Sequence, residues 1–462
     1  MKIALIVYDD DAYVHYFPMG VAALTAVLEK KYTVDLILQD ANHYPDEYIT
    51  QYLDTHDIDV VGLSFVGGYY QYRKAKQISL AVNRAKKRPF YILGGHGPSP
   101  EPEFFMRKME ADAVCIGEGE ETIMEIMEAL GKPERDLSTI AGLAYRDGNS
   151  FKINLRREPI ADIDSLPIPA YHRFPMNYYR LLRFPRCAKN DYVIPMLSGR
   201  GCPFKCNFCY RMDEGFRPRS NDRILEEIEL LKHDYGITYI LFGDELLMSS
   251  FERTESFCEA LIAQNANIKW GASGRLNYAR PDLLRLMRKA GCVFLNYGIE
   301  SFDNNSLKLM NKSLTEEQIQ KGIEATLEAG ISPGYNMIFG NYGDNLETLR
   351  KSVDFLLRYD DGAQLRTIRP VTPYPGSQLY YDALASGKLK DCEDFYEHKH
   401  TNSDLLSVNF TSLSDEEFYK ALHWANTTLL DNYQARVRKQ TEEQLNALYG
   451  NRDATFRGFR HL

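Results

Sequence analysis

The stretch Ser198-Gly-Arg-Gly-Cys-Pro-Phe-Lys-Cys-Asn-Phe-Cys-Tyr210 carries Cys202, Cys206 and Cys209 in a CxxxCxxC array. It directly follows the short apolar run 193–197, which predicts a buried strand. Three thiolates can hold three irons of a cubane iron-sulfur cluster, and the fourth iron then stays open to a substrate or cosubstrate. Parallel α/β folds place their chemistry just past the ends of strands. The array therefore predicts an open cluster at a strand end.

A zinc site, or a chance group of buried thiols, is the alternative interpretation of these cysteines. Structural zinc usually needs a fourth Cys or His at short spacing, and the nearest upstream thiol, Cys187, lies across a segment that contains proline. The cysteines outside the array are scattered singly, so they could not hold an auxiliary cluster: Cys115, Cys187, Cys258, Cys292 and Cys392. We interpret each as a small buried hydrophobe.

Size and composition bound the class of protein. The chain has 462 residues and 44% hydrophobic content, enough to bury a large core in two or three domains. Eight cysteines, no N-terminal signal pattern and no apolar run long enough to span a bilayer predict a cytoplasmic protein. The net charge of -9 argues against wholesale electrostatic binding to nucleic acid, so a small-molecule or peptide substrate is expected.

Residues 1–135 predict a Rossmann-like domain. Short β-rich runs alternate with helical patterns, as in βα units that form a parallel sheet. The runs are 3–8, 34–38, 60–65, 90–93 and 113–116. Three of the loops that follow are rich in glycine: 64–69 (Ser-Phe-Val-Gly-Gly-Tyr), 94–98 (Gly-Gly-His-Gly-Pro) and 117–119 (Gly-Glu-Gly). Because glycine allows close backbone approach, these loops indicate a large or flat ligand, although ordinary tight turns would explain any one of them.

The rest of the chain divides into three predicted parts. Residues 136–190, interrupted by several prolines, predict an extended linker. Residues 191–385 predict six βα units, a partial version of the eight-unit TIM-type barrel. Their strands are the run before the cysteines and 238–242, 270–273, 293–299, 331–339 and 363–368. Residues 386–462 predict a small helical C-terminal region, with one or two helices over 413–438.

On these motifs the chain resembles the cobalamin-dependent radical S-adenosylmethionine (SAM) enzymes. Their CxxxCxΦC signature has an aromatic residue at Φ, matched here by Phe208. In that family the open iron chelates SAM, and one electron from the cluster cleaves the sulfonium to a 5′-deoxyadenosyl radical. The resemblance covers residues 1 to about 385. It implies a 4Fe-4S cluster, SAM and cobalamin as cofactors, and an external one-electron reductant of the flavodoxin or ferredoxin type.

The resemblance also implies a SAM site at the ends of successive barrel strands. The segment 243–245 stands where the family's Gly-Gly-Glu meets the SAM amino group, with Asp244 in place of the second glycine. Ser273 and Arg275 suit the SAM carboxylate, and Glu300 suits the ribose hydroxyls. The full set of implied SAM-binding residues is Phe208, Gly243, Asp244, Glu245, Ser273, Arg275, Glu300, Asn336 and Ile338.

For cobalamin, the resemblance implies the glycine loops and the start of the first helix. The set is His15, Phe17, Met19, Gly20, Ser64, Phe65, Gly67, Gly68, Gly94, Gly95, His96, Gly97, Gly117, Glu118 and Gly119. The Asp-x-His-x-x-Gly motif, which supplies a histidine to cobalt in the mutases, is missing. His15 and His96 are nearby candidates for the lower face of the metal, and a hydrogen-bonding role is the alternative for both.

The expected reaction is methylation of an unactivated carbon through methylcobalamin. Oxidative cyclisation or ring rearrangement, as in the anaerobic porphyrin-ester cyclases, would use the same cofactors and is the first alternative. A third possibility is that the N-terminal domain binds no cobalamin and serves as a docking module. No residue is assigned as a catalytic acid, base or nucleophile.

Overall fold

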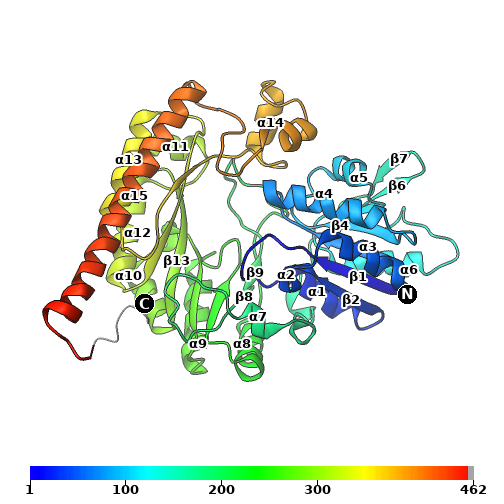
Figure 1. The fold of residues 1–462 in the computed structure, drawn as a ribbon, viewed down its shortest axis with the longest axis horizontal. Coiled ribbons are helices and arrows are strands. Elements are labelled where there is room, and N and C mark those ends of the chain that lie inside the picture. The colour runs from blue at the N-terminus through cyan, green and yellow to red at the C-terminus, as the bar shows by residue number, and fades with distance from the viewer. Residues whose placement is uncertain (456–462) are drawn as a thin grey trace.

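The computed structural model describes residues 1–455 of the chain. Two sheets of mainly parallel strands stand side by side, one built from the N-terminal third and one from the centre of the chain (Figure 1). Among the described residues, no helix has the length and apolar character needed to cross a membrane. Residues 456–462, the end of the predicted C-terminal helical region, lie outside the described part.

The N-terminal sheet confirms the predicted Rossmann-like fold. Its strand order is β2-β1-β3-β4-β5-β6-β7, and the first five strands are parallel. These strands are β1 (Lys2–Val7), β2 (Thr33–Leu38), β3 (Val60–Ser64), β4 (Phe90–Gly94) and β5 (Ala113–Cys115). The helices between them are α1 (Met19–Leu28), α2 (Gln39–Asn42), α3 (Asp46–Thr55), α4 (Tyr69–Asn83), α5 (Pro102–Met109) and α6 (Glu120–Leu130).

Helices cover both faces of this sheet because the side chains of β1 are apolar in both directions. Leu5 and Val7 of β1 pack with residues of α1 and α6. The alternate residues Ala4 and Ile6 pack with residues of α3, α4 and α5. A parallel strand buried on both faces is a continuous apolar run, as the sequence of β1 is.

The sheet continues past residue 135, where we expected the linker to begin. Strand β6 (Leu143–Asp147) pairs antiparallel with β5, and β7 (Ser150–Ile153) pairs antiparallel with β6. Both strands are largely exposed toward their shared turn, and β6 (Leu-Ala-Tyr-Arg-Asp) shows no apolar alternation in the sequence. From there to residue 190 the chain holds only short helical turns, among them α7 (Met176–Tyr179).

The second sheet confirms the partial (β/α)6 barrel. Six parallel strands lie in the order β15-β14-β13-β12-β11-β8. They are β8 (Val193–Met196), β11 (Tyr239–Phe242), β12 (Lys269–Gly274), β13 (Cys292–Glu300), β14 (Ser332–Phe339) and β15 (Ile368–Pro370). The prediction of the last strand at 363–368 was wrong in its bounds. The guanidinium of Arg366 instead bonds to the carboxylate of Asp361 and the carbonyl of Pro333, and holds that segment as a loop.

Capping side chains set the ends of the barrel helices. These helices are α8 (Asn221–Tyr235), α9 (Phe251–Ala263), α10 (Pro281–Lys289), α11 (Asn304–Leu309), α12 (Glu316–Glu328) and α13 (Leu346–Arg358). Thr315 and Gln318 form a reciprocal capping box at the start of α12. Gly236 ends α8 in the left-handed conformation, with φ of 66°.

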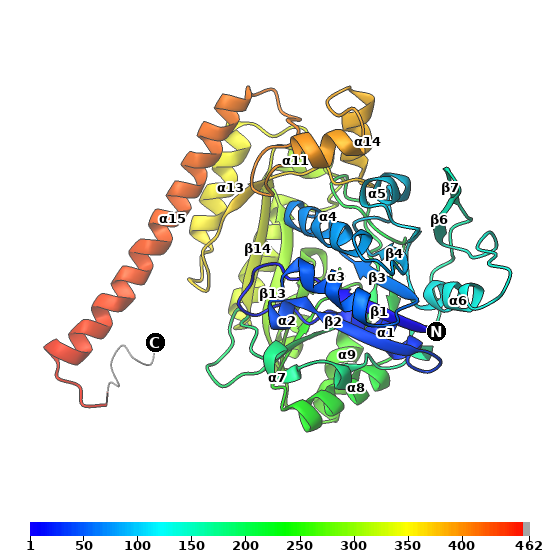
Figure 2. The ribbon, with the colours of Figure 1, turned by 45° about the vertical axis from the view of Figure 1, so that its right-hand side comes forward.

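The C-terminal region has two parts with different contacts. Its first part, which follows α14 (Gln378–Ala385), packs on the N-terminal domain: Tyr396 stacks on Tyr72 of α4 with ring centroids 4.4 Å apart. The second part is the single helix α15 (Asp415–Leu445), which runs beside α13 in both views (Figures 1 and 2). Phe418 of α15 stacks on Phe339 of β14 at 4.9 Å between centroids.

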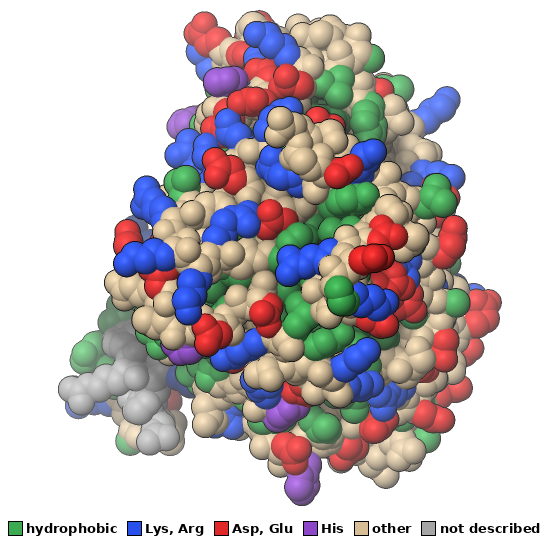
Figure 3. All heavy atoms as spheres, turned by 90° about the vertical axis from the view of Figure 1, so that its right-hand side faces the viewer, with side chains coloured by type: hydrophobic (Ala, Val, Ile, Leu, Met, Phe, Trp, Pro, Cys, Tyr) green, Lys and Arg blue, Asp and Glu red, His purple; other side chains and the backbone are tan. Residues whose placement is uncertain are grey.

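The face of the N-terminal domain in Figure 3 carries charges of both signs. Lys and Arg side chains alternate with Asp and Glu side chains around hydrophobic ones (Figure 3). A nucleic-acid footprint is a patch or stripe of basic side chains. On this face the basic side chains stand among acidic ones (Figure 3).

Replacing Glu397 by Gln is expected to loosen the contact between the C-terminal segment and α4. Burial acts to raise the pKa of Glu397, but bonds from Lys76, Tyr72 and Lys108 outweigh it and lower the pKa to about 2. Because the folded-state pKa lies below the ordinary 4.5, the stabilisation is complete above pH 4.5 and is lost as the pH falls toward 2.

Urea unfolding at pH 7 and pH 3 measures this effect. The free energy of unfolding of E397Q should lie below that of the wild type at pH 7, and the gap should narrow at pH 3. The matched control is E393Q. Of the side chains that bind Glu397, Glu393 contacts only the Lys108 ammonium, so E393Q should lower the free energy of unfolding at pH 7 by less than E397Q does. If the free energies of unfolding of E397Q and the wild type differed equally at both pH values, the lowered pKa of Glu397 would be contradicted.

Candidate functional site

The cysteine array forms a loop closed at its base by a two-stranded ribbon. Strands β9 (Gly199–Arg200) and β10 (Arg217–Pro218) pair antiparallel on either side of it. Gly201 has φ of 85°, and a Cβ there would lie 2.5 Å from the carbonyl of Gly215, so only glycine fits where the ribbon opens into the loop. The close approach of the two chain segments holds the loop in one conformation.

The three thiols of the loop converge. Each is free of a disulfide. Burial of the Cys202 thiol, with the nearby charges of Glu245 and Cys206, raises its pKa. The Cys209 thiol in turn interacts electrostatically with Cys206, Glu300 and Cys202. Three soft sulfur ligands on one short loop are a donor set that suits an iron-sulfur cluster with one iron left without a cysteine.

Asp244, which replaces a family glycine, anchors the start of this loop to the end of β11. Its buried carboxylate accepts hydrogen bonds from the backbone N–H of Ser198 at 2.7 Å, the Ser198 hydroxyl at 2.5 Å and the N–H of Gly199 at 3.0 Å. Burial raises the pKa of Asp244 to about 6. Its side chain therefore connects two strand ends, and Glu245 beside it is exposed at the cavity described below.

Arg275 and Glu300 lie in a buried group of charges near the cysteines. The Arg275 guanidinium stacks 3.3 Å from the ring centroid of Phe204 and donates to the carbonyl of Lys312. The Glu300 carboxylate accepts from the Lys312 ammonium at 2.9 Å, and both side chains are under 10% exposed. Glu300 has φ of 72° at an irregularity of β13, which lets its side chain reach this group.

Lys312 is a residue that sequence reasoning missed. Its ammonium lies 5.6 Å from the ring centroid of Phe208, the residue before the last cysteine of the array, and it pairs with Glu300. The lysine follows a helix rather than a strand, so a search of strand ends passes over it. The only available signal was the need of a buried Glu300 for a cation.

Ser273, Asn336 and Ile338 lie on the inner surface of the barrel sheet. Ser273 is paired in register with Asn296 of β13, and Asn336 with Gly298. Asn336 is exposed although it lies within a parallel strand, and Ile338 is half-buried, whereas the intervening residues of β14 are buried. The barrel therefore presents a polar, accessible strip at these strands, to which Asn296 also contributes.

A cavity of about 330 Å³ lies between the two domains. On the N-terminal side it is lined by the ends of β3, β4 and β5 and the start of α1, and on the barrel side by Gly243, Asp244, Glu245 and the ribbon. Gly20 and Gly117 line it, and a Cβ on either would meet no atom within 4 Å. The glycines thus leave space that any side chain would fill, which fits a large ligand lying against the backbone.

Nine of the predicted cobalamin residues line this cavity: Met19, Gly20, Ser64, Gly94, Gly95, His96, Gly117, Glu118 and Gly119. Phe17, Phe65, Gly67, Gly68, Gly97 and His15 do not. Phe65 packs under the loop of Gly97, whose Cβ would lie 2.8 Å from its ring. Phe17 stacks on Tyr171 of the linker at 5.0 Å between centroids. These residues support the cavity from behind.

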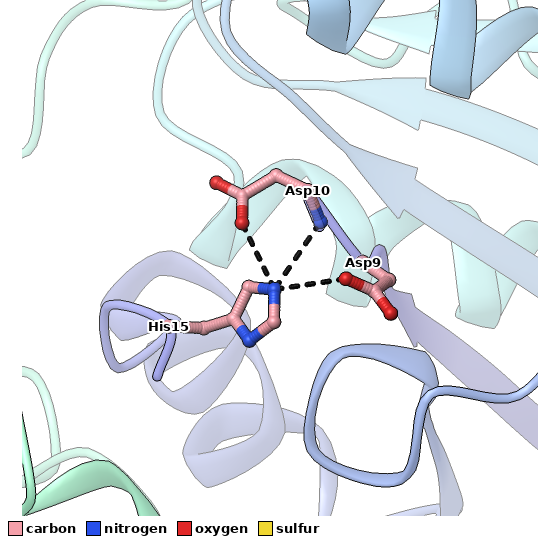
Figure 4. Close-up of side chains that lie close together, drawn as sticks. All are labelled: Asp9, Asp10 and His15. Atoms are coloured by element: carbon pink, nitrogen blue, oxygen red, sulfur yellow. Dashed lines mark hydrogen bonds and ion pairs between the residues drawn. The ribbon is translucent and has the colours of Figure 1, made fainter. Parts of the chain in front are cut away.

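The imidazole of His15 is held in an ion network beyond the cavity. Its Nε2 lies 3.0 Å from a carboxylate oxygen of Asp9 and 2.9 Å from one of Asp10 (Figure 4), and its Nδ1 lies 2.5 Å from the Tyr178 hydroxyl. Burial acts to lower the pKa of His15, but the carboxylates of Asp10, Asp40 and Asp9 raise it overall. Figure 4 shows the ring directed at the two aspartates, so His15 ties the first loop together and joins it to α7.

His96 is the histidine that faces the cavity. Its Nε2 lies 4.0 Å from a carboxylate oxygen of Glu245, and its ring meets that of Tyr210 edge-on at 5.7 Å between centroids. Burial lowers the pKa of His96, so the ring is neutral at pH 7. The side chain stands where the glycine loops, the cluster loop and β11 come together.

Replacing Lys312 by Met is expected to reduce the free energy of unfolding by about 3 kcal/mol, because it leaves the buried Glu300 carboxylate without its cation. The double variant E300Q/K312M should recover most of this loss, since it removes both charges. Urea denaturation of the two variants measures the difference. Equal destabilisation by the single and double variants would contradict the pairing.

Comparisons with known proteins agree with this geometry. Residues 196–356 match the radical SAM superfamily, and residues 7–127 match the B12 binding domain. A protein of Pyrococcus horikoshii described as an uncharacterised methyltransferase is 30% identical over 80% of this chain and 79% of its own length. The anaerobic magnesium-protoporphyrin IX monomethyl ester cyclase of Rubrivivax gelatinosus is 27% identical over 82% of this chain and 68% of its own.

The fold has a counterpart among solved structures. The radical SAM methyltransferase TsrM from Kitasatospora setae, solved with cobalamin and a [4Fe-4S] cluster, superposes with a TM-score of 0.69. It is 17% identical, and the alignment covers 83% of this chain and 75% of TsrM. With both domains in the predicted order and a 30% identical relative matched over most of its length, this chain belongs to the cobalamin-binding radical SAM enzymes.

Proposed function

We propose that this enzyme methylates an unactivated carbon of a small-molecule or peptide substrate. The observation that carries the proposal is the cavity shared by the two domains. Glycine loops of the B12 binding domain form one wall, and the ribbon that bears the cysteine loop forms the other. A methyl donor on one side and a radical source on the other would therefore reach the same space.

Different residues of the chain would bind the cluster, the corrin and SAM. Cys202, Cys206 and Cys209 would hold the cluster, and the cavity-lining glycines would hold the corrin. SAM would lie along the strip of Ser273, Asn336 and Ile338, with Glu245, Arg275 and Glu300 at its polar end. When bound, the cluster and SAM supply radical hydrogen abstraction, and cobalamin supplies a transferable methyl group. The protein positions these groups and shields them from water.

One relative supports methyl transfer, and another supports cyclisation as an alternative reaction. The Pyrococcus horikoshii relative is described as a methyltransferase, whereas the Rubrivivax gelatinosus relative is a cyclase. Ring formation on the same cofactors is therefore the second candidate. The cavity argues against a mere docking role for the N-terminal domain, because a docking module has no need of a glycine-lined space that opens toward the cysteine loop.

The proposed chemistry also sets the surroundings in which the enzyme works. An open cluster must receive one electron at a time, so we expect a flavodoxin or ferredoxin as partner. Free thiols and an oxygen-sensitive cluster suit the reducing cytoplasm.

Replacing Gly20 by Leu is expected to weaken cobalamin binding at least tenfold without lowering the thermal stability. The added side chain would enter the cavity, where a Cβ meets no atom within 4 Å, and leucine favours the helix that begins there. Titration with aquacobalamin, read by visible absorption, measures the affinity. G20A, which adds a single methyl group, is the graded control, and unchanged affinity of G20L would place cobalamin elsewhere.

Incubation with methyl-labelled SAM, reductant and cobalamin tests the reaction itself. The anaerobically reconstituted enzyme should release 5′-deoxyadenosine and transfer the label to a component of cell extract. C206A should do neither, because two cysteines cannot retain the open cluster. C258A, which removes a buried cysteine outside the array, is the matched control and should behave as the wild type. Label that stays on SAM while 5′-deoxyadenosine forms would favour the cyclase alternative.

A further inference from the structure

Glu118 lies at the centre of an ion network between the two domains. Its carboxylate accepts from Arg200 at 2.8 Å and from both terminal nitrogens of Arg217 at 3.0 Å. The backbone N–H of Ile160 donates to it at 2.7 Å. Burial acts to raise the pKa of Glu118, but the bonds from Arg217 and Arg200 lower it overall, so the group is ionised at neutral pH.

Both arginines belong to the ribbon that closes the cysteine loop. Arg200 lies on β9, just before the loop, and Arg217 on β10, just after it, and the two residues pair in register. Arg200 also donates to Glu120 at 2.5 Å, and Arg217 lies 3.5 Å from Asp213 within the loop. A single carboxylate of the N-terminal domain therefore holds both strands from which the cluster loop extends.

This network forms part of the cavity wall. Glu118, Glu120, Arg200 and Asp213 line the cavity, whereas Arg217 does not. Both Glu118 oxygens are already bonded to protein donors, and only 8% of its side chain is exposed. These bonds give Glu118 a structural role at the cavity wall. It fixes the 117–119 glycine loop relative to the ribbon.

We propose that Glu118 is a positioning residue that couples cobalamin binding in the cavity to the geometry of the cluster loop. This inference rests on the proposed binding of cobalamin by the cavity. A ligand lying against the 117–119 loop would hold that loop, and the bonds to Arg200 and Arg217 would pass the constraint to the ribbon. By linkage, a formed cluster must then tighten cobalamin binding by the same factor by which bound cobalamin tightens cluster binding.

Arg217 allows a sharp test, because it belongs to the network but not to the cavity. The dissociation constant for aquacobalamin is measured with and without the reconstituted cluster in wild type, E118Q and R217Q. In the wild type the cluster should tighten binding at least about fivefold. In E118Q and R217Q this gain should disappear, and the double variant should behave as the single ones since the two act through one contact.

Glu121 supplies the matched control. It lies in the first turn of α6, the helix that follows the 117–119 loop, and outside the cavity, and its carboxylate accepts from Arg157 at 2.9 Å instead of from the ribbon. E121Q should keep the full effect of the cluster. R217K retains the charge but not the bidentate contact, so the cluster should tighten aquacobalamin binding by an intermediate factor in this variant. R217K also replaces R217Q in the test if R217Q folds poorly.

Hydrogen exchange gives a readout that does not depend on turnover. Cobalamin should protect the backbone amides of residues 199–217 in the wild type and leave them unchanged in E118Q. An R217Q protein that keeps both the gain in affinity and this protection would overturn the coupling while leaving the proposed function intact. A wild-type protein that binds no cobalamin would overturn both.

Discussion

The carboxyl ends of two parallel sheets face a common space, and the rest of the structure depends on this arrangement. Loops after β3, β4 and β5 reach that space from one side, and the end of β11 and the ribbon reach it from the other. The cysteines and the glycine loops both lie just past the ends of buried strands, which hold them in place. The two cofactor sites can therefore meet without long flexible arms.

Electrostatic contacts, more than apolar ones, define how the loops meet. The Asp244 carboxylate joins the cluster loop to β11, and Glu118 joins the same loop to the N-terminal domain. Lys312 neutralises Glu300 in the same region. Each pair is buried, so removing one partner leaves a charge that water cannot reach. Such contacts specify one geometry more sharply than a hydrophobic surface, which tolerates small shifts.

Local patterns in the sequence predicted the architecture well. Buried parallel strands are continuous apolar runs and capping residues have specific chemistry, so the six barrel strands and the box of Thr315 and Gln318 could be foreseen. The array of cysteines and the glycine loops pointed to the right end of each sheet. Contacts between distant segments could not be foreseen, because nothing local encodes that Glu118 meets Arg217 or that Lys312 meets Glu300. The hairpin of β6 and β7 was not predicted, because both strands are short and β6 shows no apolar alternation.

The docking of the C-terminal segment has a consequence for how this protein could evolve. The N-terminal domain packs against the linker on one side, where Phe17 stacks on Tyr171. On the other side it packs against Tyr396 and Glu397 of the C-terminal segment. Although the domain comes first in the chain, part of its covering surface is encoded near the opposite end. Recombination that exchanged this domain alone would leave an aromatic patch on α4 uncovered. The N-terminal domain and the C-terminal segment should therefore be inherited together, as one evolutionary unit encoded in two separate parts of the gene.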